Sequence, residues 1–370
     1  MNKFGFIVHP IDFKTFYGHL GSVGKLLKIL PDDISRRFNI SMPPRVLSSY
    51  DKIRFLNGEV SGEVVTLPLI PIQIASLGEE RVLELIKKGI ELCVRRGAQI
   101  VGLGGFTSVV GNEGEVLAKR VSVPLTSGNT LTSSLALDGI YKAAHIMELS
   151  IHEATAAVIG ATGDIGSICT KILSKKVKKL NIAARNEQKL NEFADIIRKY
   201  GSADVEVFKY TKDAVSSADI ILSATSSVTT IIEPVNLKSG AIVCDVAIPA
   251  NIAKEVAILR DDILVFEGGL AKLPYHDDIL NEAVKDLLPK NSMYGCLAET
   301  MVLALEGRFE SFSIGRGNIT EDKMSEIKLM ASKHGITVAD FFCGYKLFTD
   351  EDIDGIKKSA EKNRDKAYVA

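Results

Sequence analysis

Short apolar runs alternate with amphipathic stretches along most of this chain. Apolar runs of roughly four to eight residues between turns are typical of buried strands, and apolar positions spaced about 3.6 residues apart predict a helix. In the middle of the chain, a run at 155–159, an amphipathic stretch from Ile165 and a run at 180–184 predict strand, helix and strand. The alternation continues to residue 266 and predicts a doubly wound parallel sheet.

The first part of the chain has an α/β pattern of its own. Its segments are a strand at Lys3–Val8, a hairpin over 51–67, a helix over 79–96, short strands at 99–103 and 121–125, and a helix over 131–149. The Asn57-Gly58 pair suits the tight turn of the hairpin. Residues 10–45 show no regular pattern.

These patterns predict an α/β protein with two domains. We expect an N-terminal α/β domain over 1–150, which would bind the substrate, and a doubly wound domain of the Rossmann type over 151–275. Residues 276–370 are expected to form C-terminal helices that pack back on the N-terminal domain, and to end in a frayed charged tail. A length of 370 residues also favours two domains over one.

The composition narrows the classes of partner. The formal net charge is −1, so no overall field favours binding to nucleic acid or a membrane. No apolar run approaches the roughly 20 residues of a membrane span. Five scattered cysteines without a CxxC pair favour a reducing cytoplasm, and the histidines form no metal-binding pattern. The sequence carries no sign of a particular oligomeric state.

A basic cluster lies within the irregular N-terminal segment. It consists of Lys25, Lys28, Arg36, Arg37 and Arg45. The cluster is either an ordinary solvated surface or a landing patch for an acidic protein.

The glycine-rich turn after the strand at 155–159 indicates a dinucleotide site. Gly160 permits a tight turn, Gly163 allows a pyrophosphate to approach the backbone, and Gly166 lets the next helix pack closely. The start of that helix offers free N–H groups to the phosphates. The residues expected to contact the cofactor here are Gly160, Thr162, Gly163, Asp164, Ile165 and Gly166. The alternative is a βα turn without a ligand.

The end of the following strand indicates which dinucleotide is bound. NAD sites usually carry an acidic residue there, whereas this chain has Arg185 and Asn186. A guanidinium suits a 2′-phosphate, so we expect NADPH as the cofactor, unless Arg185 is only a solvated loop residue. Ala224, Thr225 and Ala247 follow later strands of the sheet and are expected near the nicotinamide.

Cys296 is the candidate for covalent chemistry. It follows Gly295 near a predicted helix start, with Asn291 or Ser292 as candidate caps. The helix end should lower the pKa of the thiol, and a thiolate can accept an acyl group. The alternative is a small buried core residue.

Two polar loops follow predicted strands of the N-terminal domain. They hold the candidate substrate-binding residues, which are Gly105, Phe106, Thr107, Ser108, Asn129 and Thr130. Such loops bind ligands in many α/β domains. The alternative is that these residues cap the helices that follow them.

Four motifs resemble those of the long-chain acyl-[acyl-carrier-protein] reductases. They are Leu103-Gly-Gly-Phe-Thr-Ser108, Gly128-Asn-Thr130, the glycine turn with Ala184-Arg-Asn186, and Cys296-Leu-Ala-Glu-Thr-Met-Val-Leu303 followed by Phe312-Ser-Ile-Gly-Arg316. The resemblance covers roughly residues 3–335, and its last motif is the most specific.

This resemblance implies a two-step reduction. Cys296 falls on the nucleophilic cysteine of that family, and Gly160, Gly163 and Gly166 fall on its NADPH-binding glycines. The implied reaction transfers a fatty acyl chain from an acidic acyl carrier protein, or from coenzyme A, to Cys296. Hydride from NADPH then releases a fatty aldehyde. N–H groups at the start of the Cys296 helix, or Asn129, are expected to bind the oxyanion.

The motifs leave two further interpretations open. The segment Asp245-Val-Ala-Ile-Pro249 is more similar to glutamyl-tRNA reductases, which favours a reductase of that kind, or of the shikimate kind, without an acylated cysteine. The other interpretation is an NADP-binding module without catalysis. The acyl-accepting segment at Cys296 weighs against it.

Overall fold

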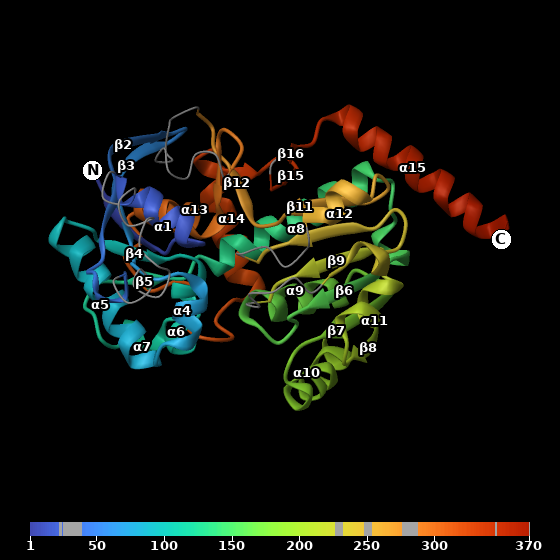
Figure 1. The fold of residues 1–370 in the computed structure, drawn as a ribbon, viewed down its shortest axis with the longest axis horizontal. Coiled ribbons are helices and arrows are strands. Elements are labelled where there is room, and N and C mark those ends of the chain that lie inside the picture. Colours follow the sequence, from blue (N-terminus) through green and yellow to red (C-terminus); the bar gives the residue numbers. More distant parts are fainter. Residues whose placement is uncertain are drawn as a thin grey trace. The chain divides into compact units, whose positions relative to one another are not determined.

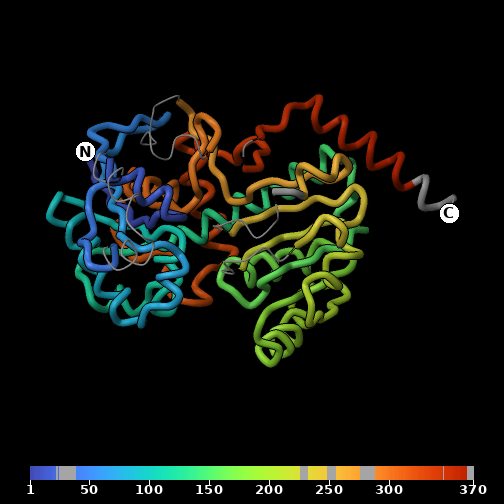
Figure 2. The backbone as a smooth tube through the Cα atoms, in the orientation of Figure 1, coloured from blue at the N-terminus to red at the C-terminus, as the bar shows by residue number. Residues whose placement is uncertain are grey.

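The protein is described by a computed structural model, which covers residues 1–21, 24, 39–225, 232–247, 254–275, 288–344 and 346–369. Two compact units divide the chain (Figures 1 and 2). Unit 1 comprises Met1–Leu131, Ala271–Asn318 and Ser325–Thr337. Unit 2 comprises Thr132–Leu270, Ile319–Met324 and Val338–Ala370.

Unit 1 is built on a mixed sheet whose order, within the described residues, is β2-β3-β1-β4-β5. The strands are β1 Lys3–Val8, β2 Arg45–Phe55, β3 Gly58–Thr66, β4 Ile100–Leu103 and β5 Leu125–Thr126. β2 and β3 form the antiparallel hairpin predicted around Asn57 and Gly58. The remaining neighbours pair in parallel, so β1, β4 and β5 end at the same edge.

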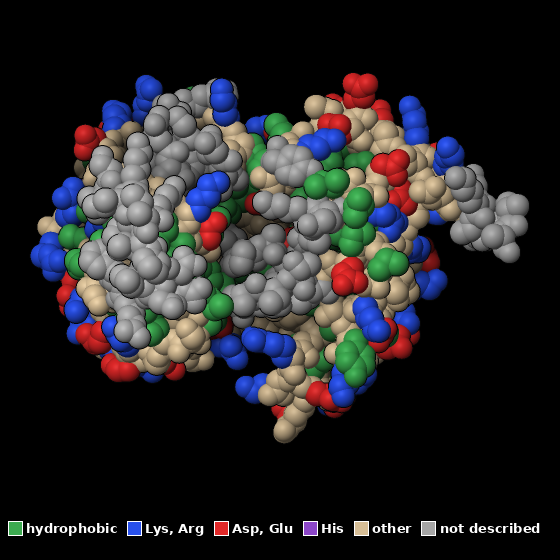
Figure 3. Space-filling model, in the orientation of Figure 1, with side chains coloured by type: hydrophobic (Ala, Val, Ile, Leu, Met, Phe, Trp, Pro, Cys, Tyr) green, Lys and Arg blue, Asp and Glu red, His purple; other side chains and the backbone are tan. Residues whose placement is uncertain are grey.

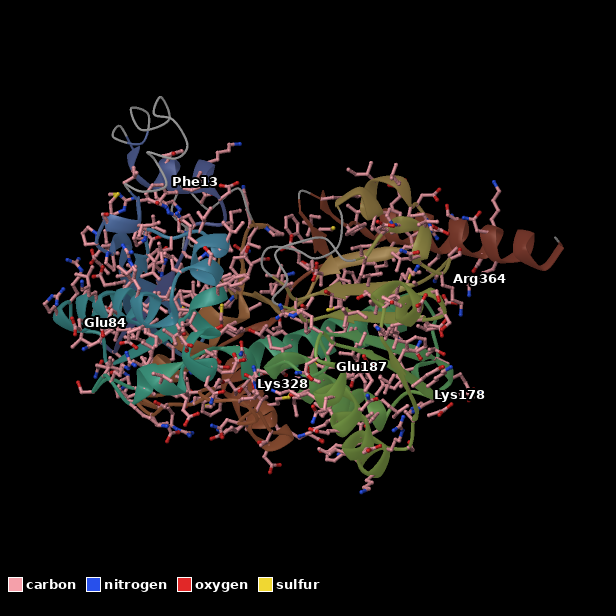
Figure 4. The ribbon with its side chains drawn as sticks, turned by 60° about the horizontal axis from the view of Figure 1, so that its bottom comes forward. Phe13, Glu84, Lys178, Glu187, Lys328 and Arg364 are labelled. Carbon is pink, nitrogen blue, oxygen red and sulfur yellow. The ribbon has the colours of Figure 1, made fainter. Side chains whose placement is uncertain are left out.

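Helices cover both faces of this sheet. They are α1 Phe13–His19, α4 Pro71–Ser76, α5 Glu79–Arg95, η1 Gly105–Ser108, α6 Val110–Glu113, α7 Glu115–Ala118 and α13 Gly295–Leu305. Gly5 of β1 lies against Cys93 of α5, whereas Gly102, the register partner of Phe6, lies against Thr300 of α13. Neighbouring strand residues point to opposite faces, so α5 and α13 enclose the sheet between them. Glu84, labelled in Figure 4, marks the more polar side of α5.

Unit 2 contains a parallel sheet whose order, in the described part of the chain, is β11-β10-β9-β6-β7-β8. The strands are β6 Thr155–Ile159, β7 Lys179–Ala183, β8 Asp204–Phe208, β9 Ile220–Ser223, β10 Ile242–Asp245 and β11 Leu264–Glu267. This is the strand order of the Rossmann fold. Apolar clusters cover both of its faces, as a parallel sheet requires. The predicted fold class is therefore confirmed.

The connecting helices of unit 2 follow the predicted alternation. They are η2 Ile151–Glu153, α9 Asp164–Ser174, α10 Glu187–Tyr200, α11 Thr211–Ser216, η3 Pro234–Asn236 and α12 Lys254–Leu259. Helix α8, Asn129–Ile146, begins in unit 1 and continues into unit 2, where Leu137, Ile140 and Ala144 join the core beneath the parallel sheet. That packing moves the boundary between the units to 131, from the expected 150.

The C-terminal region differs from the expectation. A small sheet consists of β12 Leu270–Lys272, β13 Ser292–Tyr294 and β14 Thr337–Val338. The remaining elements are α14 Glu321–Lys333, β15 Phe342–Cys343, β16 Lys346–Leu347 and α15 Asp350–Val369. The expected frayed tail is the helix α15. Thr349 and Asp352 cap its start reciprocally, and Ile353 and Ile356 are buried in unit 2. The many charged residues of this segment made its amphipathic helical pattern difficult to recognise in the sequence.

Other expectations need smaller corrections. The segment 10–45, expected to be irregular, contains α1, and β5 is shorter than the strand expected at 121–125. Lys25, Lys28, Arg36 and Arg37 of the basic cluster, and Ile248 and Pro249, lie outside the described residues. On the face drawn in Figure 3, described basic and acidic side chains are interspersed. Among the described residues, no helix combines the length and apolarity of a membrane span.

Candidate active site

Two loops of unit 1 meet the start of α13. One is η1, which follows the carboxyl end of β4, and the other is the turn from β5 into α8. Cys296 is the second residue of α13. The structure thus brings Cys296 together with Gly105 and Gly128, from both of the loops that the sequence singled out.

Gly128 provides the closest approach to the cysteine. It has a φ of 74°, and a Cβ placed on it would overlap the Cα and Cβ atoms of Cys296. Only glycine satisfies both conditions, since it lacks a Cβ and adopts positive φ without strain. The backbone of residues 127–129 therefore lies directly against the cysteine.

The start of α13 differs from the expectation. The N-cap is Tyr294, which makes no side-chain cap hydrogen bond, because β13 runs into the helix without a loop. The expected caps are therefore wrong: Ser292 is buried in β13, and Asn291 precedes that strand.

The ionisation of Cys296 also differs from the expectation of a lowered pKa. Burial raises the pKa of the Cys296 thiol to about 12, and the negative charge of Glu299 adds to the effect. The backbone N–H groups of Leu297, Cys296 and Gly105 act in the opposite direction and lower the pKa, because they favour a negatively charged sulfur. The helix end does favour the thiolate, but desolvation of the sulfur outweighs it.

His9 holds η1 in place, and the sequence analysis missed it. Its Nε2 accepts a hydrogen bond of 3.0 Å from the N–H of Phe106, and its Nδ1 lies 3.0 Å from the carbonyl oxygen of Pro10. This pattern requires the neutral ring with the proton on Nδ1. Burial lowers the pKa of His9, which favours the same neutral form. A histidine at the end of a buried strand was the available signal.

The hydroxyl side chains of η1 form hydrogen bonds within the same segment of the chain. The Thr107 hydroxyl donates to the carbonyl oxygen of Gly104 at 2.8 Å, and that of Ser108 donates to Gly105 at 2.7 Å. Phe106 is buried in the apolar core of unit 1. Among these candidate substrate residues, the backbone N–H of Gly105 is the group that acts on the sulfur of Cys296.

Asn129 and Thr130 form the first turn of α8 and do not remain in a loop as expected. Both are buried, and the Thr130 hydroxyl lies 2.6 Å from the hydroxyl of Ser313. Ser313 and Glu299 belong to this arrangement, and the sequence analysis did not single them out. A glutamate three residues after Cys296 in an otherwise apolar helix was the signal for Glu299.

In unit 2 the glycine turn lies where the strand order reverses. Gly160 follows β6 with a φ of 82°, and a Cβ there would lie 2.5 Å from the carbonyl oxygen of Ala224. Ala224 and Thr225 follow β9, the neighbour of β6 at this reversal. Rossmann sheets bind their nucleotide at this switch point. The turn and the Ala224–Thr225 segment are therefore brought together there.

The residues present fit a dinucleotide. A Cβ on Gly166 would overlap the carbonyl oxygen of Gly160, so α9 can start directly behind the turn only with glycine there. Thr162 and Gly163 are partly exposed, whereas Asp164 is buried in the first turn of α9 and Ile165 packs partly on the core. The start of α9 thus presents backbone N–H groups to a phosphate.

The remaining candidate cofactor residues occupy the other strand ends. Arg185 is exposed between β7 and α10, and Asn186 is the N-cap of α10, accepting a hydrogen bond of 2.9 Å from the N–H of Lys189. The Ala247 N–H donates to Asp245 at 3.1 Å. Asn186 therefore has a structural role as the N-cap of α10. Within the described part of the chain, no group of three or more His, Cys, Asp or Glu side chains could hold a metal ion.

Comparisons with known proteins agree with this organisation. The family model for shikimate / quinate 5-dehydrogenase matches residues 142–266, which covers most of unit 2. A long-chain acyl-[acyl-carrier-protein] reductase from Synechococcus elongatus is 27% identical over 341 residues, covering 86% of this chain and 96% of that protein. The resemblance seen in the motifs therefore extends over most of both chains.

Other relatives share parts of the chain. The aminotransferase PigE of a Serratia species is 30% identical over 345 residues, which are 91% of this chain and 39% of that protein, so this chain spans about two fifths of its length. A glutamyl-tRNA reductase from Cyanophora paradoxa is 26% identical over about half of this chain. The solved shikimate 5-dehydrogenase from Listeria monocytogenes covers 89% of this chain and 96% of its own, with 11% identity and a TM-score of 0.34.

The Gly128 contact generates a prediction about stability. Gly128→Ala should lower the free energy of unfolding by more than about 3 kcal/mol, because it adds a backbone overlap to the roughly 1–2 kcal/mol of left-handed strain. Gly317→Ala is the matched control, since Gly317 has a φ of 81° but nothing within 4 Å of its Cβ position. Urea unfolding of both variants measures the difference. Equal losses would contradict the close contact.

His9 generates a prediction about pH. Its pKa is lowered from 6.5, so below that pH the unfolded chain binds a proton that the folded chain does not. The free energy of unfolding should therefore fall as the pH drops below 6.5, by up to about 1.4 kcal/mol per pH unit from this residue. His9→Gln keeps an acceptor for the Phe106 N–H and should show a shallower fall in urea titrations. Identical slopes for the two proteins would refute a buried neutral His9.

Proposed function

We propose that this chain is an NADPH-dependent reductase that converts long-chain fatty acyl thioesters to aldehydes through a thioester on Cys296. The observation that carries the proposal is the close approach of the Gly128 backbone, just after β5, to Cys296 in the first turn of α13. The N–H groups of Leu297 and Gly105 act on the same sulfur and lower its pKa. The 27% identity with a long-chain acyl-[acyl-carrier-protein] reductase over most of both chains supports it.

In the first step, Cys296 takes the acyl group. The sulfur gives up its proton and attacks the thioester carbonyl; the new carbon–sulfur bond forms while the bond to the carrier's sulfur breaks, and the carrier thiolate takes up a proton. The N–H groups of Leu297 and Gly105 stabilise the Cys296 thiolate before attack. N–H groups at this helix start also suit the oxyanion of the tetrahedral intermediate.

In the second step, the acyl group leaves as an aldehyde. When bound, NADPH supplies the hydride that reduces the thioester carbon. The Cys296 sulfur then departs and regains its proton, which its high pKa favours. Gly160, Gly163 and Gly166 would hold the pyrophosphate against the start of α9, and Arg185 would meet the 2′-phosphate.

The acyl donor follows from the same proposal. An acyl carrier protein is acidic, and fatty acyl-CoA offers the same thioester on the same phosphopantetheine arm. The two donors are therefore both candidates, with the fatty chain as the common part of the substrate. Arg45 is the member of the predicted basic landing patch that the structure describes.

One alternative function has an observation in its favour. The match of residues 142–266 to shikimate / quinate 5-dehydrogenase, together with the glutamyl-tRNA reductase similarity, favours a reductase that uses unit 2 without acylating Cys296. Under that alternative, the Cys296→Ser variant would keep the reductase activity of the wild-type protein. A module that only binds NADP would bind the nucleotide and turn over no thioester.

The acyl intermediate generates a prediction about covalent labelling of Cys296. Mixed with palmitoyl-carrier protein or palmitoyl-CoA without NADPH, the protein should gain one palmitoyl group in intact mass, and NADPH should discharge it as aldehyde. Cys296→Ser should gain none. Cys343→Ser, which changes the partly exposed cysteine of unit 2, is the control and should behave as wild type. An adduct on Cys296→Ser, or none on wild type, would reject this mechanism.

Arg185 generates a prediction about the choice between NADPH and NADH. Arg185→Ala should weaken NADPH binding at least about tenfold and leave NADH binding unchanged, because only NADPH carries the phosphate that the guanidinium meets. Arg198→Ala removes an exposed charge farther along α10 and serves as the control. The chain contains no tryptophan, so nucleotide fluorescence can be titrated without that background. Equal losses for both nucleotides would refute the role of Arg185.

A further inference from the structure

Helix α13 carries one buried charge within an apolar sequence. Glu299 is fully buried, and its neighbours along the helix, Ala298, Met301 and Val302, are buried apolar residues. A buried carboxylate is expensive unless several donors satisfy it. Its partners therefore indicate what the residue does.

Three donors from separate segments satisfy this carboxylate. They are the hydroxyl of Thr126, the N–H of Leu131 at 2.8 Å and the hydroxyl of Ser313 at 2.6 Å. Ser313 in turn lies 2.6 Å from the hydroxyl of Thr130, and its carbonyl oxygen accepts from Ser127 at 2.5 Å. Glu299 thus lies at the centre of a buried polar cluster.

The cluster takes over the capping of α8. Gly128 precedes this helix and has no side chain to cap it, because a side chain would overlap Cys296. The N–H groups of the first turn find acceptors elsewhere: that of Leu131 donates to Glu299, and that of Thr130 lies 3.4 Å from the hydroxyl of Ser313. A helix start needs such acceptors for its free N–H groups.

The bonds of Glu299 enclose the loop that touches the cysteine. Thr126 comes before Gly128 and Leu131 after it, and both donate to the same carboxylate. Glu299 follows Cys296 by three residues on α13, about one helical turn. One side chain therefore ties the residues on both sides of Gly128, at the end of β5 and in the first turn of α8, to the helix that carries the thiol.

We propose that Glu299 is a positioning residue of the Cys296 site, whose carboxylate holds residues 127–130 against the thiol. The proposal deepens the proposed function and rests on it in treating Cys296 as the nucleophile. Glu299 touches neither substrate nor cofactor in this role. It fixes the position of the Gly128 backbone, which lies against one side of Cys296.

The same carboxylate acts on the thiol through its charge. The groups that act on the sulfur are the N–H groups of Cys296 and Leu297 from α13, the N–H of Gly105 from η1, and Glu299. His9, behind η1, is neutral because burial lowers its pKa. Removing the charge of Glu299 without changing its shape should therefore make thiolate more available, which a purely structural role would not do.

The test compares Glu299→Gln and Glu299→Ala with wild type and with Glu306→Gln, which removes a charge at the far end of α13. Acylation by palmitoyl-CoA, followed by intact mass, is the first measurement. We expect Glu299→Ala to lose at least about tenfold in rate, and Glu299→Gln to restore it to within about threefold of wild type. Acylation of Glu299→Ala at the wild-type rate, or equal impairment of both variants, would overturn the proposal.

Alkylation of Cys296 by iodoacetamide is the second measurement, and it needs no enzymatic activity. At about pH 8 the alkylation rate of Glu299→Gln should exceed that of wild type about three- to tenfold, while Glu306→Gln should equal wild type. A pH profile that is the same in Glu299→Gln and wild type would overturn the proposal. If wild type is alkylated but never acylated, the proposed function fails, and the alkylation rates still decide the role of Glu299.

A third variant covers the case in which Glu299→Ala does not fold. Ser313→Ala removes the hydroxyl that joins Glu299 to Thr130 and leaves the carboxylate in place. We expect its acylation rate to fall about three- to tenfold with circular dichroism unchanged. An unchanged rate in Ser313→Ala would overturn the proposal.

Discussion

The backbone at Gly128 lies directly against Cys296, where any side chain would overlap the cysteine. The rest of the unit 1 site depends on this contact. Because residue 128 must be glycine, it offers no side chain to cap α8, and the first N–H groups of the helix meet Ser127, Ser313 and Glu299 instead. Because these acceptors are buried, they need further donors, which Thr126 and Thr130 supply. One steric constraint thus explains a buried polar cluster in an otherwise apolar region.

The same burial sets the chemistry available to the thiol. Burial of the sulfur raises the pKa of Cys296, which favours the protonated thiol, although the residue as a whole is partly accessible. The N–H groups of Leu297 and Gly105 become useful when the sulfur, or an oxygen bonded to the attacked carbon, carries negative charge. Under the proposed function, this arrangement suits a nucleophile that forms a transient thioester better than one that is permanently ionised.

The parallel sheet of unit 2 could be predicted almost completely, because its signals are local. The run at 155–159, the glycine turn and the helix after it became β6, the Gly160 turn and α9 with little change. Parallel strands buried on both faces are continuous apolar runs, which are visible in sequence. The unit boundary and α15 were not predicted correctly. Ile140 of α8 and Ile353 of α15 join the unit 2 core through contacts that periodicity alone does not assign to a unit.

By itself, the sequence determined the α/β class, the Rossmann turn at Gly160 and the place of Cys296 near a helix start, since each depends on neighbouring residues. Only the tertiary structure decided how the polar groups are used. Thr107 bonds its own loop, Thr130 bonds Ser313, and His9 holds η1. The Glu299 carboxylate meets an N–H group 168 positions away in the chain. The ionisation of Cys296 likewise depends on burial, which arises only when distant segments pack together.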